Sequence, residues 1–130
     1  MQIVKSLDEL KLFQKHRDFL SKFFTNVSKA QHLDRIDQMI LFGSCARGEA
    51  VANSDIDILI LDEKAEHDDD LLFELYDCAL INTSGDAQNY VGSDILTMST
   101  DKFEKYGDEP GMVQRAVKRD GVILDGSLYK

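Results

Sequence analysis

The chain has 130 residues, 43% of them hydrophobic and 30% charged, which fits one globular domain with little room for a second. Its net charge of −9 argues against a long nucleic-acid substrate, because proteins of that class gain much of their affinity from basic residues that neutralise phosphates. Because of the chain's length, we expect a single domain over residues 1–130. The two cysteines lack CxxC spacing, which indicates reduced thiols rather than disulfides or a zinc site. No apolar run has the length of a signal peptide or a membrane span, so we expect a cytoplasmic protein without membrane contact.

The first predicted element is a long amphipathic helix over residues 7–29. Ser6 and Glu9 have the spacing of a capping box, in which each side chain satisfies a free amide of the other's turn. The apolar residues that follow recur at helical spacing, and they are Leu7, Leu10, Phe13, Leu20, Phe23 and Val27. His16 falls on the same stripe, and we interpret it as a partly buried packing residue rather than a metal ligand.

Two strands are predicted next, joined by a polar loop. Residues 36–42 end in a continuous apolar run, which suits a strand covered on both faces. Gly43 and Ser44 break this strand, and Ser44 can cap a short helical turn. Residues 56–61 form the second strand.

The acidic run at residues 68–70 precedes a helical apolar pattern that extends to Leu80, and we interpret the run as a solvated helix start. Residues 82–88 are predicted to be a polar loop, and residues 90–98 a third strand in which Gly92 is a weak point or a bulge.

The C-terminal part predicts two helices and a last strand. Ser99 or Thr100 can cap a short helix that extends to Tyr106, and Pro110 fits the first turn of a helix that Gly121 ends. Residues 122–124 form the last strand. The order of elements predicts an α/β (α+β) domain with a small mixed β-sheet flanked by helices.

Asp55 and Asp57 carry the strongest chemical signal. Side chains two apart on a strand point the same way, so both carboxylates leave the sheet on one face, while Ile56, Ile58 and Ile60 point into a core. Like charges so close together repel unless a cation lies between them, and carboxylate oxygens suit Mg²⁺. An isolated pair of this kind would more often be a turn and an exposed edge residue. The Gly-Ser turn just upstream favours the metal site, because a glycine lets a phosphate approach the backbone closely.

The segment Gly43-Ser44-x-x-Arg47-Gly48, followed by Ser54-Asp55-x-Asp57 on a strand, resembles the minimal nucleotidyltransferases of the DNA polymerase beta superfamily. The resemblance covers most of the chain and implies the nucleotidyltransferase fold. The family also has a third acidic residue on a later strand. Asp94 is the best candidate for it, and Asp86, in a Gly/Asn-rich loop, is the rival.

The resemblance implies an Mg²⁺-dependent transfer of a nucleoside monophosphate, AMP from ATP, to an acceptor hydroxyl. Asp55, Asp57 and Asp94 would hold the metal, and Asp94 would also help to deprotonate the acceptor. Gly43 and Ser44 would hold the β- and γ-phosphates. Arg47 would either contact phosphate or form a surface ion pair, and both interpretations stay open.

Three classes of function remain. In the first, the chain is an antitoxin of a toxin–antitoxin system that adds AMP to a small helical HEPN-type partner protein, as the resemblance implies. In the second, the same fold neutralises its partner by contact without catalysis. In the third, it modifies a small molecule such as an aminoglycoside, bound at the interface of a homo-oligomer, and the acidic surface suits a cationic substrate.

Overall fold

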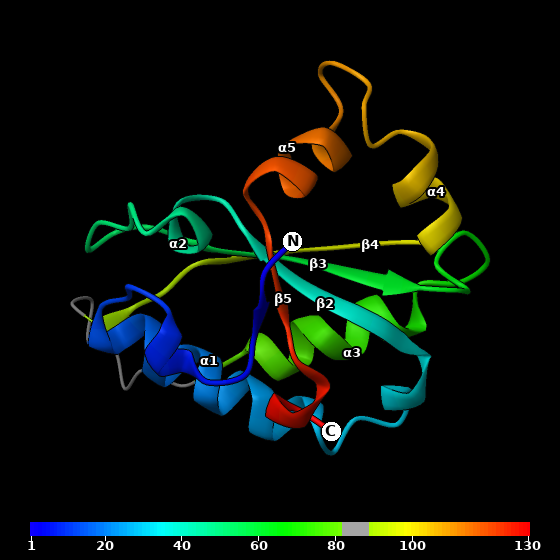
Figure 1. Ribbon diagram of the computed structural model, residues 1–130. Coiled ribbons are helices and arrows are strands. Elements are labelled where there is room, and N and C mark those ends of the chain that lie inside the picture. Colours follow the sequence, from blue (N-terminus) through cyan, green and yellow to red (C-terminus); the bar gives the residue numbers. More distant parts are fainter. Residues whose placement is uncertain (82–88) are drawn as a thin grey trace.

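The structure, a computed structural model, describes residues 1–81 and 89–130. A five-stranded mixed sheet in the order β1-β5-β2-β3-β4 forms its centre (Figure 1). The strands are β1 (Ile3–Val4), β2 (Ile36–Phe42), β3 (Ile56–Asp62), β4 (Ser93–Met98) and β5 (Val122–Leu124). The helices are α1 (Gln14–Val27), α2 (Ser44–Arg47), α3 (Asp70–Ala79), α4 (Thr100–Lys105) and α5 (Val113–Asp120). This architecture confirms the predicted α/β class with a small mixed sheet flanked by helices. The predicted loop at residues 82–88, with Asp86, lies outside the described residues.

Helices cover both faces of the sheet, with α1 and α3 on one face and α4 and α5 on the other (Figure 1). Along β3, Ile56, Ile58 and Ile60 belong to the core beneath α1 and α3. Leu59 and Leu61 belong to a second core, beneath α4 and α5. The predicted alternation along this strand is therefore confirmed, and cover on both faces explains the continuous apolar runs in β2 and β3.

A buried ion pair ties the start of β2 to the end of β3. Arg35, 7% exposed, donates from Nε and Nη2 to the two carboxylate oxygens of Asp62 at 3.1 and 2.6 Å. Its Nη1 donates to Asp68 at 2.6 Å, and the Asp68 carboxylate also accepts from the amide of Asp70, the first residue of α3. Hydrogen bonds to Asp62 and then to Asp68 raise the pKa of Arg35 further above its ordinary value, against the opposing effect of burial. The acidic run does start a helix, as predicted, but Asp68 also serves as an ion-pair partner.

The N-terminal segment contradicts the predicted helix over residues 7–29. The capping box is present, but it caps only a 3-10 turn, Leu7–Glu9, and α1 begins at Gln14. Leu10 is extended and buried, and placing it in the core turns the chain away from a helical path. The Leu7 carbonyl accepts from the Leu10 amide at 3.1 Å and also from Arg17. Arg17 donates as well to the carbonyl of Leu10, which a backbone amide of a continuous helix would have satisfied.

Two further predictions need correction, and one strand was not predicted. Strand β4 begins at Ser93 and not at residue 90. Pro110 lies before α5, which is capped at Met112, because Gly111 has a φ of 82° and interrupts any helix that starts at the proline. Strand β1, which pairs in parallel with β5, was not predicted, because two residues are too short to show a period.

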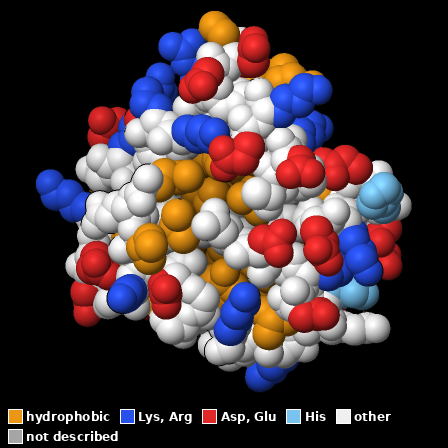
Figure 2. Space-filling model, turned by 45° about the vertical axis from the view of Figure 1, so that its right-hand side comes forward, with side chains coloured by type: hydrophobic (Ala, Val, Ile, Leu, Met, Phe, Trp, Pro, Cys, Tyr) orange, Lys and Arg blue, Asp and Glu red, His pale blue; other side chains and the backbone are white. Residues whose placement is uncertain are grey.

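The surface carries both signs of charge. On the face seen in Figure 2, lysine and arginine side chains are interspersed with aspartate and glutamate, and hydrophobic side chains gather in a band between them. Within residues 1–81 and 89–130, no helix is long and apolar enough to cross a membrane.

Candidate active site

Asp57 and Asp94 lie on neighbouring strands at the same level of the sheet. The parallel pairing of β3 with β4 places Asp57 opposite Asp94, and adjacent strands are about 4.8 Å apart. Paired residues project on the same face, which is the one that Leu59 and Leu61 share with α4 and α5. The structure therefore brings Asp94 directly beside Asp57, although the two residues are far apart in the sequence.

Two glycines make room for the first two aspartates. A Cβ atom on Gly43 would overlap Oδ2 of Asp57 and would lie 3.2 Å from its Cγ. A Cβ atom on Gly92 would overlap Oδ1 of Asp55 and would lie 3.1 Å from its Cγ. The Asp57 carboxylate thus lies against Gly43 and the Asp55 carboxylate against Gly92. Gly43 also has a φ of 76°, a conformation that favours glycine, so this position needs glycine for two reasons.

The three aspartates interact electrostatically. Partial burial, and then the charges of Asp94 and Asp55, raise the pKa of Asp57 to about 6, while Arg47 acts in the opposite direction. A carboxylate with a raised pKa near like charges marks a candidate functional site. A bound cation would relieve the same repulsion.

The carboxylates are neighbours but do not surround a common point. Among residues 1–81 and 89–130, no three His, Cys, Asp or Glu side chains form a group that could hold a metal ion. Asp55 and Asp57 lie over different glycines, which accounts for their separation. The donor set itself, carboxylate oxygens of three aspartates beside a turn, is of the kind that Mg²⁺ prefers.

The turn after β2 begins at Gly43 and not at Ser44. Gly43 caps the short helix α2, and its carbonyl accepts from the amides of Ala46 and Arg47 at 3.1 and 3.2 Å. The prediction that Ser44 caps this turn is wrong, because Ser44 is itself the first helical residue. Cys45 points inward, where its thiol donates to the Asp55 carbonyl at 3.4 Å. Burial raises the pKa of Cys45 to about 11, which keeps it a neutral thiol.

Arg47 forms ion pairs at the edge of the site. Its Nε lies 3.2 Å from Oε2 of Glu49, and its Nη1 lies 3.9 Å from Oδ2 of Asp120 on α5. Its side chain is 39% exposed and its charge lowers the pKa of Asp57. Of the two interpretations left open, the structure shows the ion pair, and the exposed geometry leaves the guanidinium able to exchange Glu49 for another anion.

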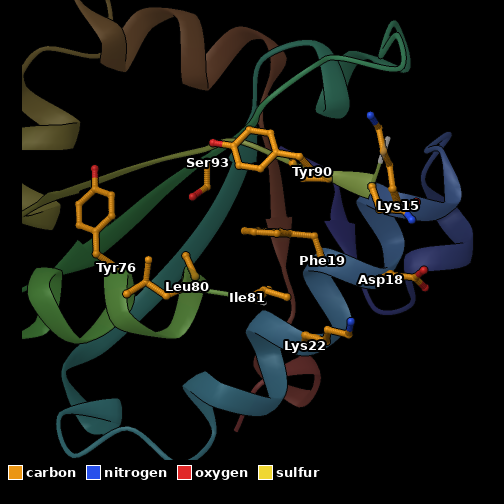
Figure 3. Close-up of a pocket in the computed structure, with 12 residues that line it drawn as sticks. Lys15, Asp18, Phe19, Lys22, Tyr76, Leu80, Ile81, Tyr90 and Ser93 are labelled. Carbon is orange, nitrogen blue, oxygen red and sulfur yellow. The ribbon is translucent and has the colours of Figure 1, made fainter. Parts of the chain in front are cut away.

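A cavity of about 650 Å³ lies on the other face of β4, between α1 and α3 (Figure 3). Phe19, Tyr76 and Tyr90 are among its lining residues, and the Tyr76 hydroxyl donates to the carbonyl of Ile95 at 3.0 Å. The described part of the lining includes Ser93 but none of the three aspartates. Strand β4 therefore separates this cavity from the carboxylates.

Sequence reasoning missed the contacts that two residues, His16 and Cys45, make near the site. His16 packs on α1, as predicted, but it is fully buried and its Nε2 lies 2.8 Å from the carbonyl oxygen of Ser54, just before Asp55. No pattern in the sequence links these positions, because they lie 38 residues apart. Cys45 was likewise not singled out, because a four-residue helix is too short to show which side is buried.

Comparison with known proteins gives two matches. Residues 26–124 match the family model described as polymerase beta, nucleotidyltransferase, a range that includes all three aspartates and the Gly-Ser turn. The chain is also 52% identical over 40 residues to "Putative protein adenylyltransferase MJ0604" of Methanocaldococcus jannaschii. That match covers 31% of this chain and 40% of the relative, so it spans less than half of the relative's length.

Proposed function

Because the chain belongs to the polymerase beta nucleotidyltransferase family, we propose that it transfers AMP from ATP to a hydroxyl group of a partner protein. The observation that carries the proposal is the position of Asp94 opposite Asp57 on adjacent strands, with Asp55 and the Gly43 turn beside them. This arrangement provides acidic oxygens next to a backbone that a phosphate can approach closely.

The acidic residues of the site have separate roles in the proposed transfer. Asp55, Asp57 and Asp94 would hold Mg²⁺, which when bound polarises the α-phosphate and neutralises charge on the leaving pyrophosphate. The acceptor oxygen forms a bond to the α-phosphorus, the bond to the β-phosphate oxygen breaks, and pyrophosphate leaves. Asp94 accepts the proton of the acceptor hydroxyl, because it is exposed on the edge strand β4 and is therefore accessible to an acceptor.

The turn at Gly43 and the side chain of Ser44 would bind the β- and γ-phosphates. Arg47 would leave Glu49 and pair with a phosphate oxygen, for which a guanidinium has matching geometry. The charge of the nucleotide then replaces one weak, exposed ion pair with a stronger one.

Support for a protein acceptor comes from the relative whose name describes a protein adenylyltransferase. We propose a small helical HEPN-type protein as the acceptor, with the chain acting as its antitoxin in the cytoplasm. A non-catalytic binding module is the second candidate, favoured by the observation that, in the described residues, the acidic side chains do not form a metal-binding group.

A labelling experiment separates the two candidates. The protein is incubated with Mg²⁺, ATP labelled at the α-phosphate and the product of the adjacent gene. The Asp55→Asn, Asp57→Asn double variant tests the site, and Asp69→Asn, Asp77→Asn, two exposed residues at or on α3, removes the same charge elsewhere. We expect label on the partner with the wild type and the control only. A stable complex without label from any of them would refute catalysis and support the binding module.

A further inference from the structure

His16 is the exception among the buried residues of α1. The others are aromatic or aliphatic, whereas His16 is a polar ring with 0% exposure, packed edge-on against Phe13. Burying a polar group lowers stability unless the group forms hydrogen bonds. The polar atoms of this ring therefore need an explanation.

One ring nitrogen is satisfied and the other is not. Nε2 lies 2.8 Å from the carbonyl oxygen of Ser54, and because a carbonyl can only accept, Nε2 carries the hydrogen. Nδ1 is buried with no hydrogen-bond partner among the described residues. A leucine would fill this stripe without an unpaired atom, so the bond to Ser54 is what the histidine provides.

The segment that receives this bond leads directly into the site. Ser54 closes a small turn with Val51, in which the Val51 amide donates to the Ser54 hydroxyl at 2.9 Å and the Ser54 amide donates to the Val51 carbonyl at 3.0 Å. Neither bond connects the turn to the rest of the fold. His16 makes that connection from α1, and the Cys45 thiol holds the next carbonyl, that of Asp55, from α2.

We propose that His16 is a positioning residue, which holds the backbone at Ser54 so that the carboxylate of Asp55 stays against Gly92 and beside Asp57. The expected effect of His16 on nucleotide binding rests on the proposed nucleotidyl transfer. Its effect on the backbone at residues 51–57 does not, and it is present in the protein without nucleotide or metal. Asp55 precedes the first residue of β3, and the Ile56 amide donates to the Gly92 carbonyl at 2.9 Å. The two carbonyls before that amide are held by side chains, that of Ser54 by His16 and that of Asp55 by Cys45.

Three variants of His16 test the bond. His16→Gln places an amide donor where Nε2 lies and keeps the bond, His16→Asn keeps a polar group that is too short to reach Ser54, and His16→Leu removes polarity altogether. Leu20→Val, one turn along the same buried stripe, controls for a core change in α1 that does not touch Ser54.

Two measurements are made on each protein: hydrogen exchange of the amides of residues 51–57 without metal, and calorimetric binding of Mn²⁺ with a non-hydrolysable ATP analogue. We expect His16→Leu and His16→Asn to speed the exchange and to weaken binding by about tenfold each, the equivalent of one hydrogen bond. His16→Gln should restore both, and Leu20→Val should lower thermal stability without changing either.

The outcomes separate this inference from the proposed function. Exchange in His16→Asn that matches the wild type, or failure of His16→Gln to restore it, overturns the inference. If the wild type does not bind the nucleotide but the exchange follows the expected order, the proposed function fails and His16 still positions the backbone. If His16→Leu does not fold, the comparison of His16→Asn with His16→Gln decides alone.

Discussion

Replacement of Asp57 by asparagine should stabilise the metal-free protein at neutral pH. Burial and the charges of Asp94 and Asp55 raise the pKa of Asp57 from 3.8 to about 6, so the ionised form is disfavoured in the folded state. Between these two values the folded protein binds more protons than the unfolded chain, and stability therefore falls as the pH rises from about 4 to about 6. Above that range the folded protein carries the full cost of the charge, which asparagine removes.

The size of the effect follows from the same shift. A change of pKa from 3.8 to about 6 corresponds to about 3 kcal/mol. Asp57 is only partly buried and salt screens its neighbours, so we expect about 1–2 kcal/mol at pH 7. For a domain of this size, that raises the melting temperature by roughly 3–8 °C.

Thermal unfolding followed by circular dichroism in EDTA, at pH 4 and pH 7, measures the gain. Asp108→Asn, an exposed residue whose charge does not act on Asp57, is the control and should change little. The gain of Asp57→Asn should be present at pH 7 and absent at pH 4, and saturating Mg²⁺ should stabilise the wild type more than the variant. A gain that is equal at both pH values, or a loss at pH 7, would refute the reasoning.

Three further predictions concern single contacts. Arg35→Met should lower the free energy of unfolding, measured in urea, by about 3–5 kcal/mol, because it leaves the Asp62 carboxylate buried without its ion-pair partner. Adding Asp62→Leu should recover most of this loss, and no recovery would contradict this account of the ion pair. Gly43→Ala should reduce nucleotide binding at least about tenfold in calorimetry, since its Cβ displaces the Asp57 carboxylate. Gly111→Ala is the control, because Gly111 also has a positive φ, 82°, but has open space around it; this variant should lose only stability, by about 1 kcal/mol. Ser99→Ala removes the cap that accepts from the Lys102 amide and should cost about 1 kcal/mol in thermal unfolding. Ser99→Thr keeps the hydroxyl and should not lose this stability, so equal losses would argue against the cap.

Local patterns in the sequence were sufficient for much of the fold. Strands β2 and β5 and the caps at Ser99 and Gly121 agree with prediction, because apolar runs, alternation and capping residues act within a few positions along the chain. The same reasoning failed at residues 7–13. There the helical spacing of apolar residues is real, but burial of Leu10 and the reach of Arg17 override it.

The arrangement of the candidate site was likewise predicted only in part from the sequence. The sequence by itself determined that Asp55 and Asp57 share a neighbourhood with the Gly43 turn, because a strand period of two and a short loop leave few other arrangements. Only the tertiary structure decided that Asp94 lies opposite Asp57, that Gly92 makes room for Asp55, and that His16 holds the backbone beside it. These contacts join segments tens of residues apart, and they exist because strand pairing and helix packing bring those segments together, which no local pattern records.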